Sequence, residues 1–202
     1  MAEPYVLILY YSRHGSTAAM AQQVARGVVQ VSGVDARLRT VPSVSAEIDR
    51  PISPEVPDDG PVYCDEDDLR YCSAMALGSP TRFGNMAAPL KYFIDNTSPL
   101  WVSGALVDKP AGVFASTASL HGGQETTLLT MALPLIHHGM IYVGLPYTSA
   151  ELHSTQTGGT PYGPTHWAEG GSKDGELSHH ESTLCQALGR RLARFAAAGI
   201  PA

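Results

Sequence analysis

The chain has 202 residues, of which 44% are hydrophobic and 16% charged, and its formal net charge is −6. A chain of this length buries about 70% of its unfolded surface, so we expect residues 1–202 to form one domain around one core without a disulfide or metal staple. The negative charge, together with the lack of a basic stripe, argues against a nucleic-acid groove.

Strand-like and helix-like segments alternate along the chain. Strands are predicted over 5–11, 34–41, 74–78, 110–115 and 140–144, and helices over 16–31, 85–96, 124–138 (interrupted at Pro134) and 176–198. Continuous apolar runs such as 5–11 are typical of strands buried on both faces of a parallel sheet. The order of elements predicts an α/β, flavodoxin-like three-layer sandwich, in which a five-stranded parallel sheet carries helices on both faces.

Two long segments interrupt this alternation. Residues 42–71 are rich in Pro and Asp, and residues 147–172 are rich in Gly, Thr and Pro. Neither contains enough periodic apolar residues for a core of its own, so we interpret both as long loops inserted into one domain. Loops of this length in a compact domain usually bind ligands or form interfaces. After the second insertion, His179-His180-Glu181 is expected to be a solvated helix start.

Cysteine usage and the N-terminal apolar stretch bear on location. Cys64, Cys72 and Cys185 are an odd number without C-x-x-C spacing, which favours a reducing, cytoplasmic compartment. The apolar stretch 5–11 is too short for a membrane span or for the core of a signal peptide. We therefore expect a cytoplasmic protein without an integral membrane segment.

The loop between the first strand and the first helix is the first candidate ligand site, because ligands of open parallel sheets bind beyond the carboxyl ends of the strands. It reads Ser12-Arg13-His14-Gly15-Ser16-Thr17. Three hydroxyls, a glycine and the orphan N–H groups of a helix N-terminus suit a phosphate monoester. A capping role explains Ser16 equally well, but it accounts for one hydroxyl rather than three. Neither G-x-x-x-x-G-K-[ST] nor G-x-G-x-x-G occurs at this turn, which argues against a nucleoside triphosphate or a resident dinucleotide.

Two further loops follow strands at the same predicted edge. The second loop offers a stiffened turn, a cation and a flat apolar face, and it contains Pro80, Thr81, Arg82, Phe83 and Gly84. The third loop presents hydroxyls and glycine, and it contains Ser116, Thr117, Ala118, Ser119, Leu120, His121 and Gly122. The second loop taken alone is equally typical of a well-capped connection. Three such loops together predict a site for an aromatic, polar-edged ring attached to a phosphate.

These loops and several other segments resemble the WrbA family of FMN-dependent NAD(P)H:quinone oxidoreductases. The resemblance covers nearly the whole chain, from Tyr5 to Phe195. Its most specific segments are Pro80-Thr-Arg-Phe-Gly-Asn-Met86, Leu100-Trp-Val-Ser-Gly-Ala105, Gly122-Gly-Gln-Glu-Thr126, His137-His-Gly-Met140 and Gly158-Gly-Thr-Pro-Tyr-Gly163. Phosphate loops alone are shared by many flavodoxin-like proteins, so the combination of segments carries the resemblance.

The resemblance implies FMN as the cofactor and a role for each loop. Residues 12–17 would hold the phosphate, 80–84 would contact the ribityl chain and ring, and 116–122 would line the pyrimidine side, although this third loop is one residue longer than the usual family form. Trp101 and His137 would border the pocket above the ring, where nicotinamide and quinone alternate. His14 stands where family members commonly carry Tyr, a residue that contacts the dinucleotide. The resemblance also implies a homotetramer in which more than one subunit builds the pocket.

The activity implied is two-electron transfer from NAD(P)H to quinones by an alternating mechanism. His137 would hydrogen-bond FMN or the quinone oxygen, or donate a proton, since an imidazole with a pKa of about 6.5 takes either form. A helix-end histidine that contacts backbone carbonyls is the structural alternative for this residue. Two other functions stay open: a flavodoxin-type electron carrier, and a non-enzymatic regulatory or binding protein. No H-E-x-x-H or G-x-S-x-G occurs, so we expect neither a metal site nor a hydrolase.

Overall fold

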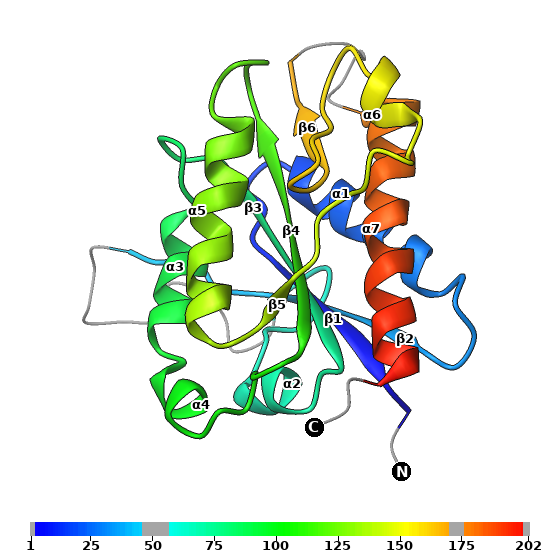
Figure 1. The fold of residues 1–202 in the computed structure, drawn as a ribbon. Helices are drawn as coiled ribbons and strands as arrows, with labels where there is room; N and C mark the ends of the chain where they lie inside the picture. Colours follow the sequence, from blue (N-terminus) through cyan, green and yellow to red (C-terminus); the bar gives the residue numbers. More distant parts are fainter. Residues whose placement is uncertain (1–2, 46–56, 170–175, 200–202) are drawn as a thin grey trace.

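The computed structural model describes residues 3–45, 57–169 and 176–199. Strands and helices alternate through most of this chain (Figure 1). The elements are β1 (Tyr5–Tyr10), α1 (Ser16–Val28), β2 (Asp35–Thr40), α2 (Glu66–Arg70), β3 (Ala74–Pro80), α3 (Ala88–Asp95), α4 (Ser98–Val102), β4 (Pro110–Thr117), α5 (Gln124–His137), β5 (Ile141–Tyr142), α6 (Glu151–Ser154), β6 (Thr165–Trp167) and α7 (His179–Ala198).

One parallel sheet organises the fold. The strands lie in the order β2-β1-β3-β4-β5, and every pair is parallel. This is the flavodoxin-like order. Strand addition moves outward from β1 first on one side, to β2, and then on the other, to β3, and a ligand-binding crevice forms between β1 and β3 at the carboxyl ends of the strands. The predicted fold class is confirmed. A short sixth strand is added, because β6 of the second insertion pairs in parallel with the end of β4, at Ala115–Thr117.

Helices cover both faces of the sheet and divide the core into two. In Figure 1, α3 and α5 lie on one side, and α1 and α7 lie on the other. Every residue of β1 is buried. Since successive strand side chains point to opposite faces, Leu7 and Leu9 pack in the α3–α5 core, whereas Val6 and Ile8 pack in the α1–α7 core.

The helices α1 and α7 pack so closely that their backbones are in contact. A Cβ atom built at Gly27 would lie 2.0 Å from the carbonyl oxygen of Gln186, and one at Gly189 would lie 2.0 Å from that of Val24. Only glycine fits such a crossing. The close packing fixes α7 against α1 and, through α1, against the first ligand loop.

Several predicted boundaries change. The helix α5 is not interrupted at Pro134 but continues to His137, where Gly139 follows with a left-handed φ of 78°. Pro134 lies in the last turn, and the buried Met131 and Leu135 on either side hold the helix to the sheet. The helices expected to begin at residues 85 and 176 begin at Ala88 and His179, and the fifth strand shortens to two residues.

Both insertions contribute structure within the described residues. In the first, α2 follows an isolated bridge between Thr40 and Tyr63, and Asp68 of α2 pairs with Arg37 and Arg39 of the edge strand β2. Residues 46–56 of this insertion and 170–172 of the second lie outside the described residues. The second insertion supplies α6 and β6.

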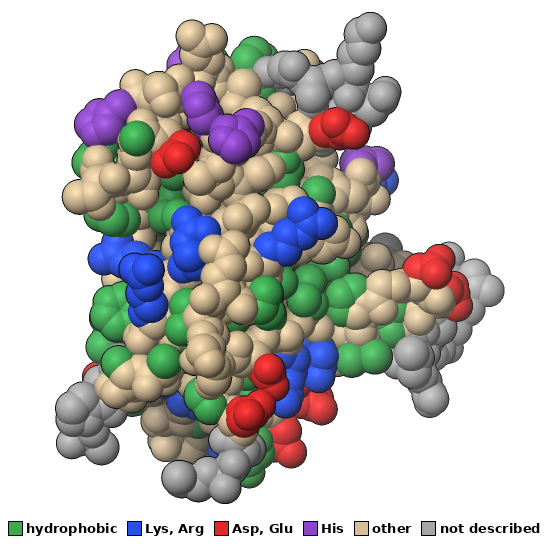
Figure 2. All heavy atoms as spheres, turned by 90° about the vertical axis from the view of Figure 1, so that its right-hand side faces the viewer, with side chains coloured by type: hydrophobic (Ala, Val, Ile, Leu, Met, Phe, Trp, Pro, Cys, Tyr) green, Lys and Arg blue, Asp and Glu red, His purple; other side chains and the backbone are tan. Residues whose placement is uncertain are grey.

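The surface over α7 mixes basic, acidic and histidine side chains (Figure 2).

All three cysteines are free, and burial raises the pKa of each thiol, which makes them poor nucleophiles. Within the described ranges, no helix combines the length and apolar character needed to cross a bilayer.

Candidate functional site

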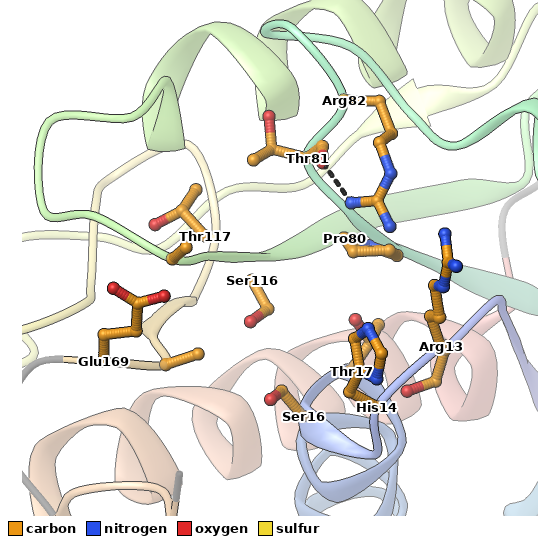
Figure 3. A pocket seen from close by; sticks show the side chains of 13 residues that line it. Arg13, His14, Ser16, Thr17, Pro80, Thr81, Arg82, Ser116, Thr117 and Glu169 are labelled. Carbon is orange, nitrogen blue, oxygen red and sulfur yellow. Dashed lines mark hydrogen bonds between the residues drawn. The ribbon is translucent and has the colours of Figure 1, made fainter.

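A pocket of about 250 Å³ lies where β1, β3 and β4 end (Figure 3). All three loops singled out in the sequence contribute to it. The residues that line it are Ser12, Arg13, His14, Ser16, Thr17, Pro80, Thr81, Arg82, Ser116, Thr117, Ala118, Ala168 and Glu169. Parallel strands bring these segments together, although they are spread through the sequence from Ser12 to Glu169.

The first loop presents unpaired donors to the pocket. Gly15 has a φ of 93°, and this left-handed conformation turns the chain into α1 without any side-chain cap on the helix N-terminus. Ser16 is therefore not a capping residue. Ser12 Oγ is buried and has no hydrogen-bond partner among the described residues. Because a buried hydroxyl without a partner costs free energy, this loop is arranged for a ligand that supplies acceptors.

The second loop is a tight turn with an exposed tip. Arg82 and Asn85 exchange backbone hydrogen bonds of 2.8 and 3.0 Å, and Phe83 (φ 52°) and Gly84 (φ 76°) form the tip. The Phe83 side chain is fully exposed and lies outside the pocket lining, as does Gly84. Thr130 Oγ1 of α5 donates to the Gly84 carbonyl at 2.9 Å, which holds the turn against that helix.

The second and third loops are joined to each other. The Thr81 N–H donates to the Ser116 carbonyl at 2.8 Å, and the Thr81 and Thr127 hydroxyls lie 2.7 Å apart. Thr117 Oγ1 donates to the Ser119 carbonyl at 2.9 Å. The start of the third loop therefore faces the pocket, whereas its later residues are outside the lining, namely Ser119, Leu120, His121 and Gly122.

The sequence did not predict one wall of the pocket, which the second insertion forms. Ala168 and Glu169 line it because β6 extends the sheet beside β4, where the Ala168 N–H donates to the Thr117 carbonyl at 2.8 Å. Trp167 Nε1 also donates to the Ala118 carbonyl at 2.9 Å. A strand of three residues inside a glycine-rich insertion is too short to show a recognisable alternation of apolar and polar residues.

A buried carboxylate, Glu181, anchors this wall to α7. Only 1% of Glu181 is exposed, so the expectation of a solvated helix start is wrong for this residue. It accepts hydrogen bonds from the backbone N–H groups of Gly158, Trp167 and Ser178, and its Oε2 lies 3.0 Å from His166 Nδ1. Burial alone raises the pKa of this carboxyl, but the hydrogen bonds from His166, Ser178 and Trp167 lower it to about 2. The sequence signal was the capping box Ser178-x-x-Glu181, whose acid also reaches the insertion.

Trp101 and His137 lie together, but far from the pocket of the same chain. Trp101 Nε1 donates to the His137 carbonyl at 2.8 Å. His137 ends α5, whose first residue, Gln124, contacts Thr117 at the pocket. A helix of 14 residues rises about 20 Å, so His137 is at the opposite end of the molecule. Figure 1 shows α4 and the end of α5 at that opposite end.

The donor set of the pocket fits FMN. The uncapped helix N-terminus and the orphaned Ser12 hydroxyl match the acceptors of a phosphate monoester, and Arg13 and Arg82 add positive charge at the same edge. Figure 3 shows the Ser16, Thr17 and Ser116 side chains around one central space. Among the described residues, no group of three or more His, Cys, Asp or Glu side chains is suited to a metal ion.

Comparison with known proteins agrees with this arrangement. Residues 4–153 match the family described as NADPH-dependent FMN reductase. A protein of Solidesulfovibrio magneticus named NAD(P)H dehydrogenase (quinone) is 45% identical over 200 residues, covering 93% of this chain and 95% of that protein. The crystal structure of a flavodoxin, WrbA-like protein from Agrobacterium tumefaciens is 26% identical with a TM-score of 0.68, over 96% of this chain and 98% of that one. An archaeal flavodoxin shares the fold at 19% identity and a TM-score of 0.60, over 96% and 99% of the two chains. The chain therefore belongs to the NADPH-dependent FMN reductase family, as a WrbA-like, flavin-dependent oxidoreductase.

Proposed function

We propose that this flavin-dependent oxidoreductase is an NAD(P)H dehydrogenase that reduces quinones in two alternating half-reactions at one pocket. The observation that carries the proposal is the buried, unpartnered Ser12 hydroxyl beside an uncapped helix, in a pocket built from three strand-end loops. The similarity to a relative named NAD(P)H dehydrogenase (quinone) supports the choice of substrates.

The three loops divide the binding of FMN. Ser12, Ser16 and Thr17 hold the phosphate together with the N–H groups that open α1. Thr81 and Arg82 contact the ribityl chain, and Ser116, Thr117 and Ala118 border the ring. When bound, FMN supplies the hydride acceptor and the two-electron donor. Backbone N–H groups at the start of the third loop would border the pyrimidine edge of the ring, where such donors favour negative charge.

A second subunit completes the substrate side of the pocket. Trp101 and His137 cannot reach the pocket of their own chain, and they lie on an exposed apolar surface that we call the α5 face. This face comprises Phe83, Trp101, Val102, Leu129, Leu133 and Ile136, all of them exposed. Leu129, Leu133 and Ile136 follow one another at helical spacing, which is typical of a helix that packs on a partner. We propose that a homotetramer buries the α5 face and brings Trp101 and His137 of one subunit to the pocket of another.

His137 then acts on the substrate rather than on its own chain. Trp101 binds only the His137 backbone carbonyl, and within the described residues the His137 imidazole makes no hydrogen bond. Placed above the ring of a neighbouring subunit, it hydrogen-bonds the quinone oxygen and donates a proton as the hydroquinone forms. Trp101 forms the flat wall against which the nicotinamide and the quinone lie in turn.

Steady-state kinetics of the FMN-loaded protein test this function. With NAD(P)H and benzoquinone as the varied substrates, parallel double-reciprocal lines are expected, because one product leaves before the second substrate enters. Intersecting lines would refute the alternating scheme. NADH oxidation that needs a separate reductase would favour an electron carrier instead.

A further inference from the structure

A second cavity adjoins the flavin pocket on the side of α3. Its volume is about 560 Å³, and Arg13 and Arg82 line both cavities. Figure 3 shows the two guanidinium groups extending on the same side of the flavin pocket. Lys91 of α3 lines the second cavity but not the first. We call this second cavity the α3 groove.

The α3 groove is basic in a protein that is acidic as a whole. Arg13, Arg82 and Lys91 line it, and none of its described lining residues is a carboxylate, whereas the net charge of the chain is −6. By contrast, Arg37 and Arg39 of the edge strand β2 both contact the carboxylate of Asp68. Among the described residues no carboxylate pairs with Arg13 or Arg82, so the groove keeps an excess of positive charge that suits an anionic ligand.

These cations keep donors available. Arg13 forms no hydrogen bond or ion pair in the part of the chain that the structure describes. Arg82 uses one N–H on the carbonyl of Thr81 at 2.7 Å, which leaves most of its five donors unused. Lys91 contacts Asp95 at 2.5 Å, an exposed pair of the kind that contributes little and exchanges easily. The groove is also lined by the half-buried Tyr11, whose ring offers an aromatic surface on which a purine base packs well.

Resting on the proposed function, we propose that the α3 groove binds the adenosine half of the nicotinamide dinucleotide and makes the enzyme prefer NADPH. The nicotinamide must reach the flavin pocket, so the pyrophosphate follows at the shared Arg13 and Arg82, and the adenosine lies farther out. Lys91, which lines the groove but not the flavin pocket, binds the 2′-phosphate. That group is the only difference between NADPH and NADH, so Lys91 is the specificity-determining residue.

The test compares kcat/KM for NADPH and NADH in the FMN-loaded enzyme with benzoquinone as acceptor. Lys91→Gln is expected to lower the NADPH-to-NADH ratio about fivefold, the scale of one exposed ion pair, while kcat/KM for NADH stays constant. The matched control on the same helix is Asp95→Asn, which removes the partner of Lys91 and is expected to keep or raise the ratio. An unchanged ratio in Lys91→Gln, or an equal loss with both dinucleotides, would overturn the proposal while leaving quinone reduction intact.

A binding measurement separates the groove from the reaction. Titration calorimetry of the FMN-loaded protein should show tighter binding of adenosine 2′,5′-bisphosphate than of 5′-AMP, and Lys91→Gln should abolish the difference. Equal affinities in the unsubstituted protein would overturn the proposal even if turnover is normal. If turnover fails but the difference persists, the groove stands and the proposed reaction falls.

Discussion

Replacing Ser12 by Ala is expected to weaken FMN binding without destabilising the free protein. In the free protein, Ser12 Oγ is buried without a partner among the described residues, so its removal relieves an unsatisfied group and gains up to about 1 kcal/mol. In the complex, the same hydroxyl donates to a charged phosphate, and losing that hydrogen bond costs about 1.5–3 kcal/mol, or roughly 10- to 150-fold in Kd. The substitution therefore stabilises the free protein but destabilises the FMN complex, and both changes weaken FMN binding.

The assay is fluorescence titration of the apoprotein with FMN, alongside urea unfolding of the apoprotein. Riboflavin, which lacks the phosphate, should bind Ser12→Ala and the unsubstituted protein equally. Ser103→Ala is the matched control, since Ser103 Oγ donates to the Leu100 carbonyl at 3.1 Å in α4, away from the pocket. It should leave FMN affinity unchanged. An unaltered FMN Kd in Ser12→Ala, or an equal loss of riboflavin affinity, would refute the placement of the phosphate.

Three other substitutions test separate parts of the structure. Leu133→Glu places a charge on the α5 face, so light scattering should show smaller assemblies and quinone reduction should fall, while FMN still binds. The control Val29→Glu, at an exposed site outside that face, should change neither the assembly size nor the rate of quinone reduction. Glu181→Gln should be less stable than the unsubstituted protein at pH 7. Because the pKa of Glu181 is depressed, its ionised carboxylate contributes stability above about pH 4.5, and this stability is lost as the pH falls toward 2. Unfolding curves of Glu181→Gln should lack this loss. The same pH dependence in the variant and the unsubstituted protein would contradict the stabilising role of the Glu181 carboxylate. Gly189→Ala brings a Cβ within 2.0 Å of the Val24 carbonyl oxygen and should cost about 1–3 kcal/mol in urea unfolding, whereas an unchanged midpoint would show that α1 and α7 separate easily.

The sheet was predictable because its strands are continuous apolar runs. The segment 5–11 is buried along the whole of β1, and the alternation with helices leaves few possible strand orders. Helix boundaries were less accurate, because they depend on which residue is the N-cap. Ser178, rather than a residue near 176, caps α7 through its hydroxyl.

The sequence predicted the site residues whose role follows from local loop chemistry. It did not predict those that reach the site only through contacts between distant segments. Loop residues 12–17 and 116–118 gather at one edge because parallel strands end there, as glycine and hydroxyl content indicated. Glu169 reaches the pocket only through the pairing of β6 with β4, and Glu181 is buried only because the insertion folds back onto it. Trp101 and His137 were expected at the pocket from resemblance, and one chain places them elsewhere. In the proposed homotetramer a second subunit would supply them, and such a contact leaves no sequence pattern beyond an exposed apolar face.

Anaerobic titration of the FMN-loaded protein tests quinone reduction most directly. We predict that an equimolar amount of NADPH or NADH, added without quinone, bleaches the flavin absorbance completely. An equimolar amount of benzoquinone should then restore it, through as many cycles as substrate is supplied. Protein that takes up no FMN, or bound flavin that is bleached only when a separate reductase is added, would contradict the proposed function.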